Sequence, residues 1–280
     1  MQYALLGGTG LLVSRLAFGA MTFTAGNHDI GAVYKVGAEL AKEMVGRALD
    51  RGVTFFDTAD GYAGGESEAL LGRALRHRRD SVVIATKVGF RTGAPLTQAG
   101  LSRRHITWSV EQSLTRLGTD WIDVYLAHRE DPYTPLEETL SAFDAVVASG
   151  KVRYIGFSNW SAWKVAAALE IQKANGLAPF THGQMHYSLL GRDVERDVVP
   201  MMRHYGLGMT VWSPLASGFL SASTPGRRCP NRATATPGST SCHSTRNTGS
   251  ASSTGYAPSR AGTTRAWRRP RWRGCWAARA

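Results

Sequence analysis

Three apolar runs of the chain each end in a side chain that carries a charge or a proton: Asp57, Lys87 and His128. Tyr62 follows Asp57 by five residues, in a loop that contains glycine. A carboxylate beside a lysine fixes a positive charge, and such a charge favours ionisation of a nearby phenol, whose pKa is otherwise roughly 10. With an imidazole to orient a substrate, this set suits general acid catalysis at a developing alkoxide.

Each of these residues taken alone has a simpler interpretation. An Asp–Lys pair is often only a salt bridge, a histidine at a strand end is usually structural, and a loop tyrosine is so even more often. A metal site on Asp57 and His128 is disfavoured, because Lys87 would place a cation where the metal would bind. The chemistry therefore depends on a fold that brings all four side chains together.

The pattern along the chain predicts such a fold. Short β-rich runs alternate with stretches of helical period, which is typical of βα units on a parallel sheet. The expected strands are Arg15–Gly19, Val53–Thr58, Ser81–Val88, Trp121–His128, Val152–Asn159, Phe180–Tyr187 and Gly208–Ser213. Most are continuous apolar runs, as expected for strands covered on both faces.

The helices between the strands are marked by their periodicity and by their ends. One apolar face is formed by Ile106, Val110, Leu114 and Leu117, and another by Leu136, Leu140, Phe143 and Val147. Thr134 and Glu137 predict a capping box with Pro135 at the first helical position. A glycine with positive φ is expected after each of five helices, at Gly52, Gly118, Gly150, Gly176 and Gly206.

Polar residues at the strand ends favour a (β/α)8 TIM-type barrel over a doubly wound sheet. They are Asp57, Lys87, His128, Ser158 with Asn159, Gln184 and Ser213. A closed barrel would direct all of them to one mouth, whereas an open sheet would scatter several. The glycines at 7, 8 and 10 precede a strand and open no helix, so they predict a hairpin turn under the barrel rather than a dinucleotide fingerprint.

At these residues the chain resembles the aldo-keto reductase family. The matching motifs are Asp57-Thr-Ala-Asp-Gly-Tyr62, Ala85-Thr-Lys87, Tyr125-Leu-Ala-His128, Gly150-Lys-Val-Arg-Tyr-Ile-Gly-Phe-Ser-Asn159 and Trp212-Ser-Pro-Leu-Ala-Ser-Gly-Phe-Leu220. They fall in order on successive strands and cover most of residues 1–221. Any one of them is weak, and the ordered set is specific.

The resemblance implies a reductase that uses NADPH/NADP+ to convert an aldehyde or ketone to an alcohol. Tyr62 would be the proton donor, Lys87 and Asp57 would tune it, and His128 would orient the substrate. The cofactor would be bound by Gly19, Met21, Asp57, Ser158, Asn159, Gln184, Trp212, Ser213, Leu215, Ser217 and Gly218. No metal is expected. A cofactor-binding regulatory or partner subunit with little catalysis remains the alternative.

The composition changes abruptly after Ser221. The 280 residues have a formal charge of +12, but residues 222–280 contain 11 Arg, no acidic residue and no Leu, Ile, Val, Phe or Met, so residues 1–221 are nearly neutral. Such a segment builds no core. It also holds all three cysteines, so the body has no disulfide framework and no thiolate zinc site. We expect a cytoplasmic protein whose partner is a small carbonyl compound, not nucleic acid or membrane.

Residues 222–280 depart from the family pattern, which continues with a helix, an eighth strand and a basic loop. A natural basic extension, a nucleic-acid-binding arm and out-of-frame translation are the alternatives. Ser221-Ala-Ser-Thr can be encoded as AGC GCA AGT ACN, and one restored G gives Ser-Gly-Lys-Tyr, as in the family. The same frame turns residues 271–276 into an apolar segment that resembles the family's final helix. The sequence therefore favours a frameshift after Ser221, with domain 1–221 an incomplete barrel and 222–280 an out-of-frame, disordered tail.

Overall fold

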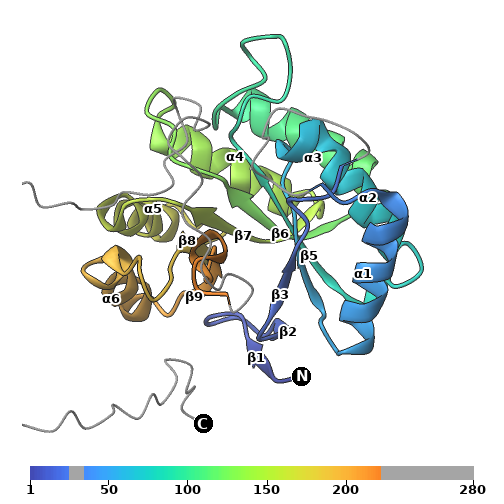
Figure 1. The fold of residues 1–280 in the computed structure, drawn as a ribbon. Helices are drawn as coiled ribbons and strands as arrows, with labels where there is room; N and C mark the ends of the chain where they lie inside the picture. Colours follow the sequence, from blue (N-terminus) through green and yellow to red (C-terminus); the bar gives the residue numbers. More distant parts are fainter. Residues whose placement is uncertain (25–34, 222–280) are drawn as a thin grey trace, which may run out of the picture. The chain divides into compact units, whose positions relative to one another are not determined.

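Seven parallel strands form the centre of the fold in the computed structural model, which describes residues 1–24 and 35–221 (Figure 1). They are β3 (Ala17–Gly19), β4 (Phe55–Asp57), β5 (Val83–Val88), β6 (Ile122–Ala127), β7 (Val152–Ser158), β8 (Phe180–His186) and β9 (Gly208–Trp212). Each strand pairs with the next one in chain order, and the sheet curves into a nearly closed barrel. All seven predicted strands and the barrel class are confirmed.

Helices alternate with these strands and lie around the outside of the sheet (Figure 1). They are α1 (Ala38–Asp50), α2 (Glu66–Leu75), α3 (Arg103–Leu117), α4 (Leu136–Ala148), α5 (Ala162–Ala174) and α6 (Val198–His204), with short 3-10 turns η1 (Tyr62–Gly65), η2 (Arg79–Ser81), η3 (Asp193–Glu195) and η4 (Ala216–Gly218). Parallel neighbours need such crossovers, so the helical face of each unit is buried on the sheet.

The N-terminal hairpin covers the bottom of the barrel, as predicted. Strands β1 (Tyr3–Leu5) and β2 (Leu12–Ser14) pair antiparallel around the glycine-rich turn. Gly7 has φ +60, and a Cβ there would lie 2.3 Å from the backbone nitrogen of Gly208, where β9 begins. Gly8 N–H donates to the carbonyl of Gly206 at 2.8 Å. Only a residue without a side chain allows the two backbones to approach so closely.

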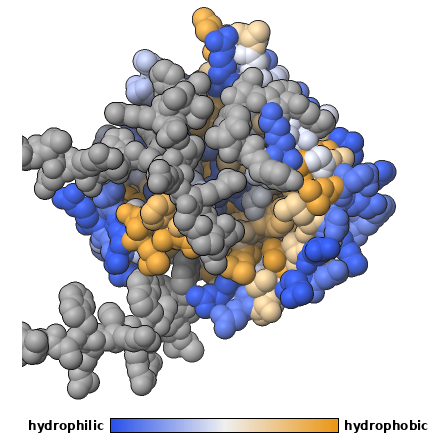
Figure 2. Space-filling view, viewed as in Figure 1, coloured by the Kyte–Doolittle hydropathy of each residue, from blue (hydrophilic) through white to orange (hydrophobic). Residues whose placement is uncertain are grey.

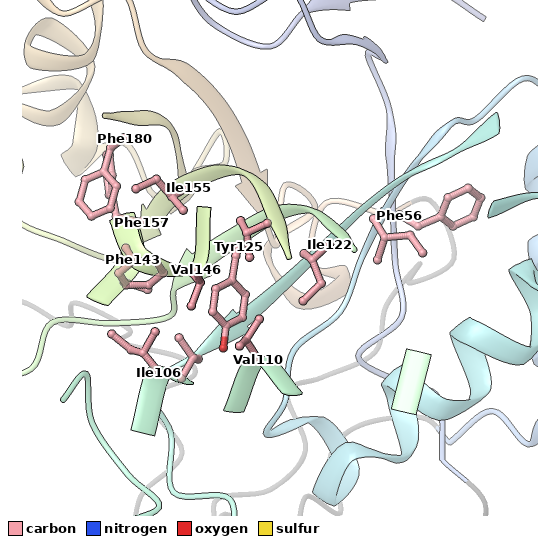
Figure 3. Close-up of a cluster of buried hydrophobic side chains, with 14 of the residues drawn as sticks. Phe56, Ile106, Val110, Ile122, Tyr125, Phe143, Val146, Ile155, Phe157 and Phe180 are labelled. Atoms are coloured by element: carbon pink, nitrogen blue, oxygen red, sulfur yellow. The ribbon is translucent and has the colours of Figure 1, made fainter. Parts of the chain in front are cut away.

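The core has two layers that follow the strand alternation of period two. Phe55 packs inside the barrel with residues of the hairpin and of β5 and β6. Its neighbour Phe56 points outward into a larger cluster between sheet and helices, part of which is shown in Figure 3. In that view the ring of Tyr125 lies between Val146 and Ile122, and its hydroxyl end lies next to Val110. The sheet therefore buries both faces, which explains its continuous apolar runs.

The predicted helix ends are confirmed at the glycines and wrong at one cap. All five glycines that follow helices have φ between +64 and +80. Helix α4 has no side-chain cap, because Thr134 Oγ1 donates to Asp131 Oδ2 at 2.7 Å instead of capping the helix. Asp131 also accepts from the backbone N–H groups of Tyr133 and Leu101, so it organises the loop that precedes α4. A nearby carboxylate competed successfully for the threonine hydroxyl.

The two edge strands of the sheet leave apolar side chains in contact with solvent. Beside β3, Leu16 is 65% exposed and Met21 47%. In and after β9, Trp212 is 42% exposed and Phe219 70%. Figure 2 shows apolar surface over both of these regions on the face in view. Within the described residues, neither β3 nor β9 has a partner on its outer edge.

One close contact between helices yields a direct test of the packing. A Cβ on Gly72 of α2 would lie 2.2 Å from the carbonyl oxygen of Leu117 at the end of α3. Gly72→Ala is therefore expected to lower the free energy of unfolding by roughly 1–3 kcal/mol. The matched control is Gly46→Ala in α1, where a Cβ would meet nothing within 4 Å; it should raise stability by roughly 0.5–1 kcal/mol. Denaturant titration of both variants measures the difference, and equal effects would contradict this packing.

Candidate active site

The four candidate acid–base residues come together at the carboxyl ends of the strands. Asp57 ends β4, Tyr62 opens η1, Lys87 lies on β5 and His128 follows β6. Lys87 Nζ is 2.7 Å from Asp57 Oδ2 and 3.4 Å from Tyr62 Oη. The rings of Tyr62 and His128 meet edge to face, with centroids 5.6 Å apart. The sequence assigned these positions to one mouth, and the fold places them there.

Lys87 carries a buried positive charge. Its side chain has no solvent exposure, and besides Asp57 it donates to the carbonyl of Thr58 at 2.7 Å. Burial lowers the pKa of Lys87, but its interactions with Asp57 and Tyr62 together outweigh burial, so the net pKa is raised above the ordinary value. The ammonium is therefore charged at neutral pH, next to the phenol of Tyr62.

Tyr62 is directed toward Lys87 by a left-handed turn. The three residues after it have positive φ: Ala63 at 49°, Gly64 at 62° and Gly65 at 94°. A Cβ on Gly65 would lie 2.6 Å from the Arg116 side chain, so this position requires glycine for space as well as for backbone freedom. Burial raises the pKa of Tyr62 more than the charge of Lys87 lowers it. The phenol therefore keeps its proton at neutral pH.

His128 is a neutral imidazole beside the phenol. It is 7% exposed. Burial, together with the charges of Lys87 and Arg129, lowers its pKa to about 3. Its Nδ1 is buried and has no hydrogen-bond partner among the described residues. The Phe90 ring packs on the imidazole at 4.4 Å between centroids, and the Arg129 guanidinium lies 4.6 Å over the Phe90 ring.

Gln184 provides a link across the barrel that the sequence did not reveal. Its Nε2 donates to Asp57 Oδ1 at 2.8 Å, while Lys87 occupies the other carboxylate oxygen. Alternation along the strands places both residues on the inner face of the barrel, where Gln184 is the register partner of Ser158. Successive side chains of a strand point to opposite faces, so counting alternate residues along each predicted strand would have shown that both side chains point into the barrel. Both oxygens of Asp57 are thus fixed by donors.

Asn159 and Trp212 form the side of the site next to β9. Asn159 has φ +58 and donates from Nδ2 to the His128 carbonyl at 3.2 Å and to Ser158 Oγ at 2.9 Å. Its Oδ1 accepts from Trp212 Nε1 at 3.0 Å. Asparagine is one of the few non-glycine residues that adopt this conformation readily, and its side-chain hydrogen bonds hold it there. The indole is thereby held with part of its surface in solvent.

The remaining candidate binding residues lie at the ends of β3 and β9, and Gly19 is the strand partner of Asp57. Ser213, Ala216 and Ser217 all have positive φ, between 48° and 55°, in the loop after β9. Leu215 is 55% exposed, and a Cβ on Gly19 would meet nothing within 4 Å. Three left-handed non-glycine residues in one short loop are strained, and such strain gathers at ligand-binding segments.

Neither a metal site nor a membrane-spanning helix has support in the part of the chain that the structure describes. No group of three or more His, Cys, Asp or Glu side chains is placed to hold a metal ion there. No helix among the described residues is long and apolar enough to cross a membrane. The predicted tail, 222–280, and its boundary lie outside the described residues.

Comparison with known proteins gives a consistent result. A family model described as "Aldo/keto reductase family" matches residues 15–254, so the match ends 33 residues beyond Ser221. A relative described as "Probable voltage-gated potassium channel subunit beta", from Oryza sativa subsp. japonica, is 40% identical over 225 residues, covering 79% of this chain and 66% of the relative. The chain therefore spans slightly less than two thirds of that protein.

Two other relatives carry names of enzymes. One, "Uncharacterized oxidoreductase YrpG" from Bacillus subtilis (strain 168), is 39% identical over 249 residues, covering 83% of this chain and 73% of the relative. The other, "Versiconal hemiacetal acetate reductase" from Aspergillus parasiticus, is 36% identical over 241 residues, covering 79% and 69%.

Proposed function

Because the chain belongs to the aldo/keto reductase family, we propose that it reduces an aldehyde or ketone with hydride from NADPH, with Tyr62 as proton donor. The observation that carries this proposal is the buried Lys87 ammonium, which is hydrogen-bonded to both Asp57 and Tyr62. A lysine held only for stability would not need to contact a phenol. The relatives named as reductase and oxidoreductase support the reaction class.

In this proposal each side chain has one task. The nicotinamide, when bound, supplies the hydride. Tyr62 then donates its phenolic proton to the oxygen of the substrate, and the charge of Lys87 stabilises the phenolate that remains. Asp57, fixed by Gln184, holds Lys87 in place. His128, which is neutral, donates a hydrogen bond from a ring N–H to the same oxygen and orients the carbonyl.

The residues on the β9 side suit a nicotinamide cofactor. Ser158 and Asn159 offer amide and hydroxyl groups, and the part-exposed Trp212 offers a flat aromatic face. In the loop that follows β9, Ser213, Ala216, Ser217 and Gly218 have positive φ, and the backbone of this loop lies beside these side chains. A preference for NADPH over NADH rests on the family resemblance, since the residues that would select the 2′-phosphate fall after Ser221.

A second candidate function has support of its own. Relatives from rice, fission yeast and Arabidopsis are named potassium channel beta subunits, so the chain could act mainly as a cofactor-binding partner of another protein. The two candidates differ in turnover. Steady-state NADPH oxidation over a panel of aldehydes and ketones separates them, because a pure partner subunit would bind NADPH without consuming it at a useful rate.

Replacing the proton donor tests the catalytic assignment. Tyr62→Phe removes only the hydroxyl and is expected to lower carbonyl reduction roughly 100-fold or more, while NADPH affinity stays nearly unchanged. The assay uses a version with one base restored after codon 221, in which the family pattern continues. Tyr133→Phe is the matched control, because Tyr133 is 93% exposed. If Tyr62→Phe turned over like the control, Tyr62 would not be the acid.

A further inference from the structure

A second carboxyl group is buried directly behind the catalytic residues. Asp60 is 1% exposed and stands two residues before Tyr62. Its Oδ2 accepts from Ser109 Oγ on α3 at 2.8 Å. Its backbone N–H donates to the carbonyl of Lys87 at 3.2 Å. One residue therefore contacts the backbone of Lys87 and the helix behind it, and lies on the turn that carries Tyr62.

The other attachments of the segment from Asp57 to Tyr62 run to neighbouring strands, to Lys87 and Gln184, and to α2. Thr58 is hydrogen-bonded to Ser67 on α2 at 2.8 Å. The N–H of Tyr62 donates to the carbonyl of Ala59 at 3.2 Å, which closes the turn within the segment. Asp60 supplies the bond from this segment to α3. Without it, the turn that carries Tyr62 would lose its attachment to that helix.

The electrostatic surroundings of Asp60 are unusual for a carboxyl group. Glu68 on α2 has no exposure and is paired with Arg116 of α3 at 2.6 Å, so the cation nearest to Asp60 on those helices is already engaged. Tyr125 of β6 faces the same space, and neither its hydroxyl nor Asp60 Oδ1 has a hydrogen-bond partner among the described residues. Burial, assisted by Glu68, raises the pKa of Asp60 to about 7.

We propose that Asp60 is a positioning residue: anchored on Ser109, it holds Tyr62 and the Lys87 backbone in register for proton transfer. This inference rests on the proposed function. Asp60 acts in two ways. The hydrogen bond to Ser109 fixes where the turn lies. The ionised carboxyl also acts on Tyr62 through its negative charge, which opposes formation of a phenolate there, although more weakly than burial and the charges of Lys87 and Asp57 affect the phenol.

Three variants separate these two actions. Asp60→Asn keeps an acceptor for Ser109 but removes the charge. Asp60→Ala removes both, and Ser109→Ala removes only the anchor and is the mildest change. The control is Asp123→Ala. Asp123 is a partly buried carboxylate paired with Arg79 at 2.8 Å, and it lies near the start of β6, away from the site.

Two readouts do not need turnover and are made on the frame-restored version, which we expect to be soluble. With tyrosines labelled at 13Cζ and Tyr62 assigned by Tyr62→Phe, titration gives the pKa of Tyr62, which should fall in Asp60→Asn. The nuclear Overhauser contact between the rings of Tyr62 and His128 reports position. It should persist in Asp60→Asn and Asp123→Ala, and weaken or vanish in Asp60→Ala and Ser109→Ala.

Turnover in the frame-restored protein gives the third readout. Since a misplacement of about 1 Å can cost roughly 100-fold in rate, kcat should fall by about that factor in Asp60→Ala, with KM for the carbonyl changed little. Asp60→Asn should keep kcat within about threefold of the parent. If Asp60→Ala and Ser109→Ala kept the ring contact and kcat, and lost only thermal stability as Asp123→Ala does, the proposal would be overturned. Absence of turnover in every variant would count against the proposed function alone, because the two magnetic-resonance readouts still decide the role of Asp60.

Discussion

Lowering the pH from 7 to 4 is expected to lower the free energy of unfolding by about 3 kcal/mol, because two buried histidines that are neutral in the folded protein take up protons when the chain unfolds. His128 and His182 are 7% and 0% exposed, and burial with the charge of Lys87 lowers the pKa of each to about 3. His182 lies on the inner face of β8, one layer below Gln184, with both ring nitrogens unpartnered among the described residues.

The sign follows from proton binding. A histidine in the unfolded chain has a pKa near 6.5, so between pH 6.5 and 3 the unfolded state binds protons that the folded state does not. Each histidine therefore contributes about 5 kcal/mol above pH 6.5, which is lost as the pH falls toward 3. Asp60 works in the opposite direction, because its pKa is raised from 3.8 to about 7 in the folded protein. As the pH falls from 7 to 4, Asp60 therefore adds up to about 4 kcal/mol to the free energy of unfolding.

Between pH 7 and 4 the two histidines together remove about 6–7 kcal/mol and Asp60 adds about 3–4 kcal/mol, so the net loss is about 3 kcal/mol. This is a substantial part of the roughly 5–15 kcal/mol that stabilises a typical domain. Thermal unfolding followed by circular dichroism between pH 4 and 7 measures the loss. His182→Gln should remove about half of the histidine contribution and flatten the profile. His77→Gln, at an exposed position on the surface, should leave the profile unchanged. A parent profile as flat as that of His182→Gln would show that these histidines do not control acid stability.

The strands and the clustering of the candidate acid–base residues were predictable from the sequence for a physical reason. Strands covered on both faces must be apolar throughout, so a polar residue at the end of such a run stands out, as Asp57, Lys87 and His128 do. Glycines that follow helices were predictable because few other residues accept positive φ. These are local signals, and all of them are visible within one βα unit.

Contacts that join separate units were not predictable in the same way. The hydrogen bond from Gln184 to Asp57 spans 127 positions of the chain, and that between Asp60 and Ser109 spans 49. Either depends on strand register and helix rotation, which the period-two and 3.6 patterns do not fix in three dimensions. The failed cap of α4 has a related cause. Thr134 had two possible partners, and the position of Asp131 decided between them.

Restoring one base after codon 221 is expected to convert a poorly soluble, inactive chain into a stable reductase. In the described residues β3 and β9 are edge strands, and such unpaired edges promote aggregation. Beside them Leu16, Trp212 and Phe219 are 65%, 42% and 70% exposed. Burying a large apolar side chain contributes roughly 1.5–3 kcal/mol, so covering these positions would add a substantial part of a typical domain's stability.

The experiment compares the present chain, the frame-restored version and a version that ends at Ser221. Solubility, the midpoint of thermal unfolding and NADPH affinity are measured for each. We expect only the restored version to be soluble and to bind NADPH, because the sequence of residues 222–280 has no aliphatic side chain larger than alanine, apart from proline, with which to cover β3 and β9. The version that ends at Ser221 separates loss of the covering segment from an effect of the arginine-rich tail. If the present chain unfolded cooperatively and bound NADPH as tightly as the restored one, the change of reading frame would have no functional consequence, and residues 1–221 would suffice for the cofactor site.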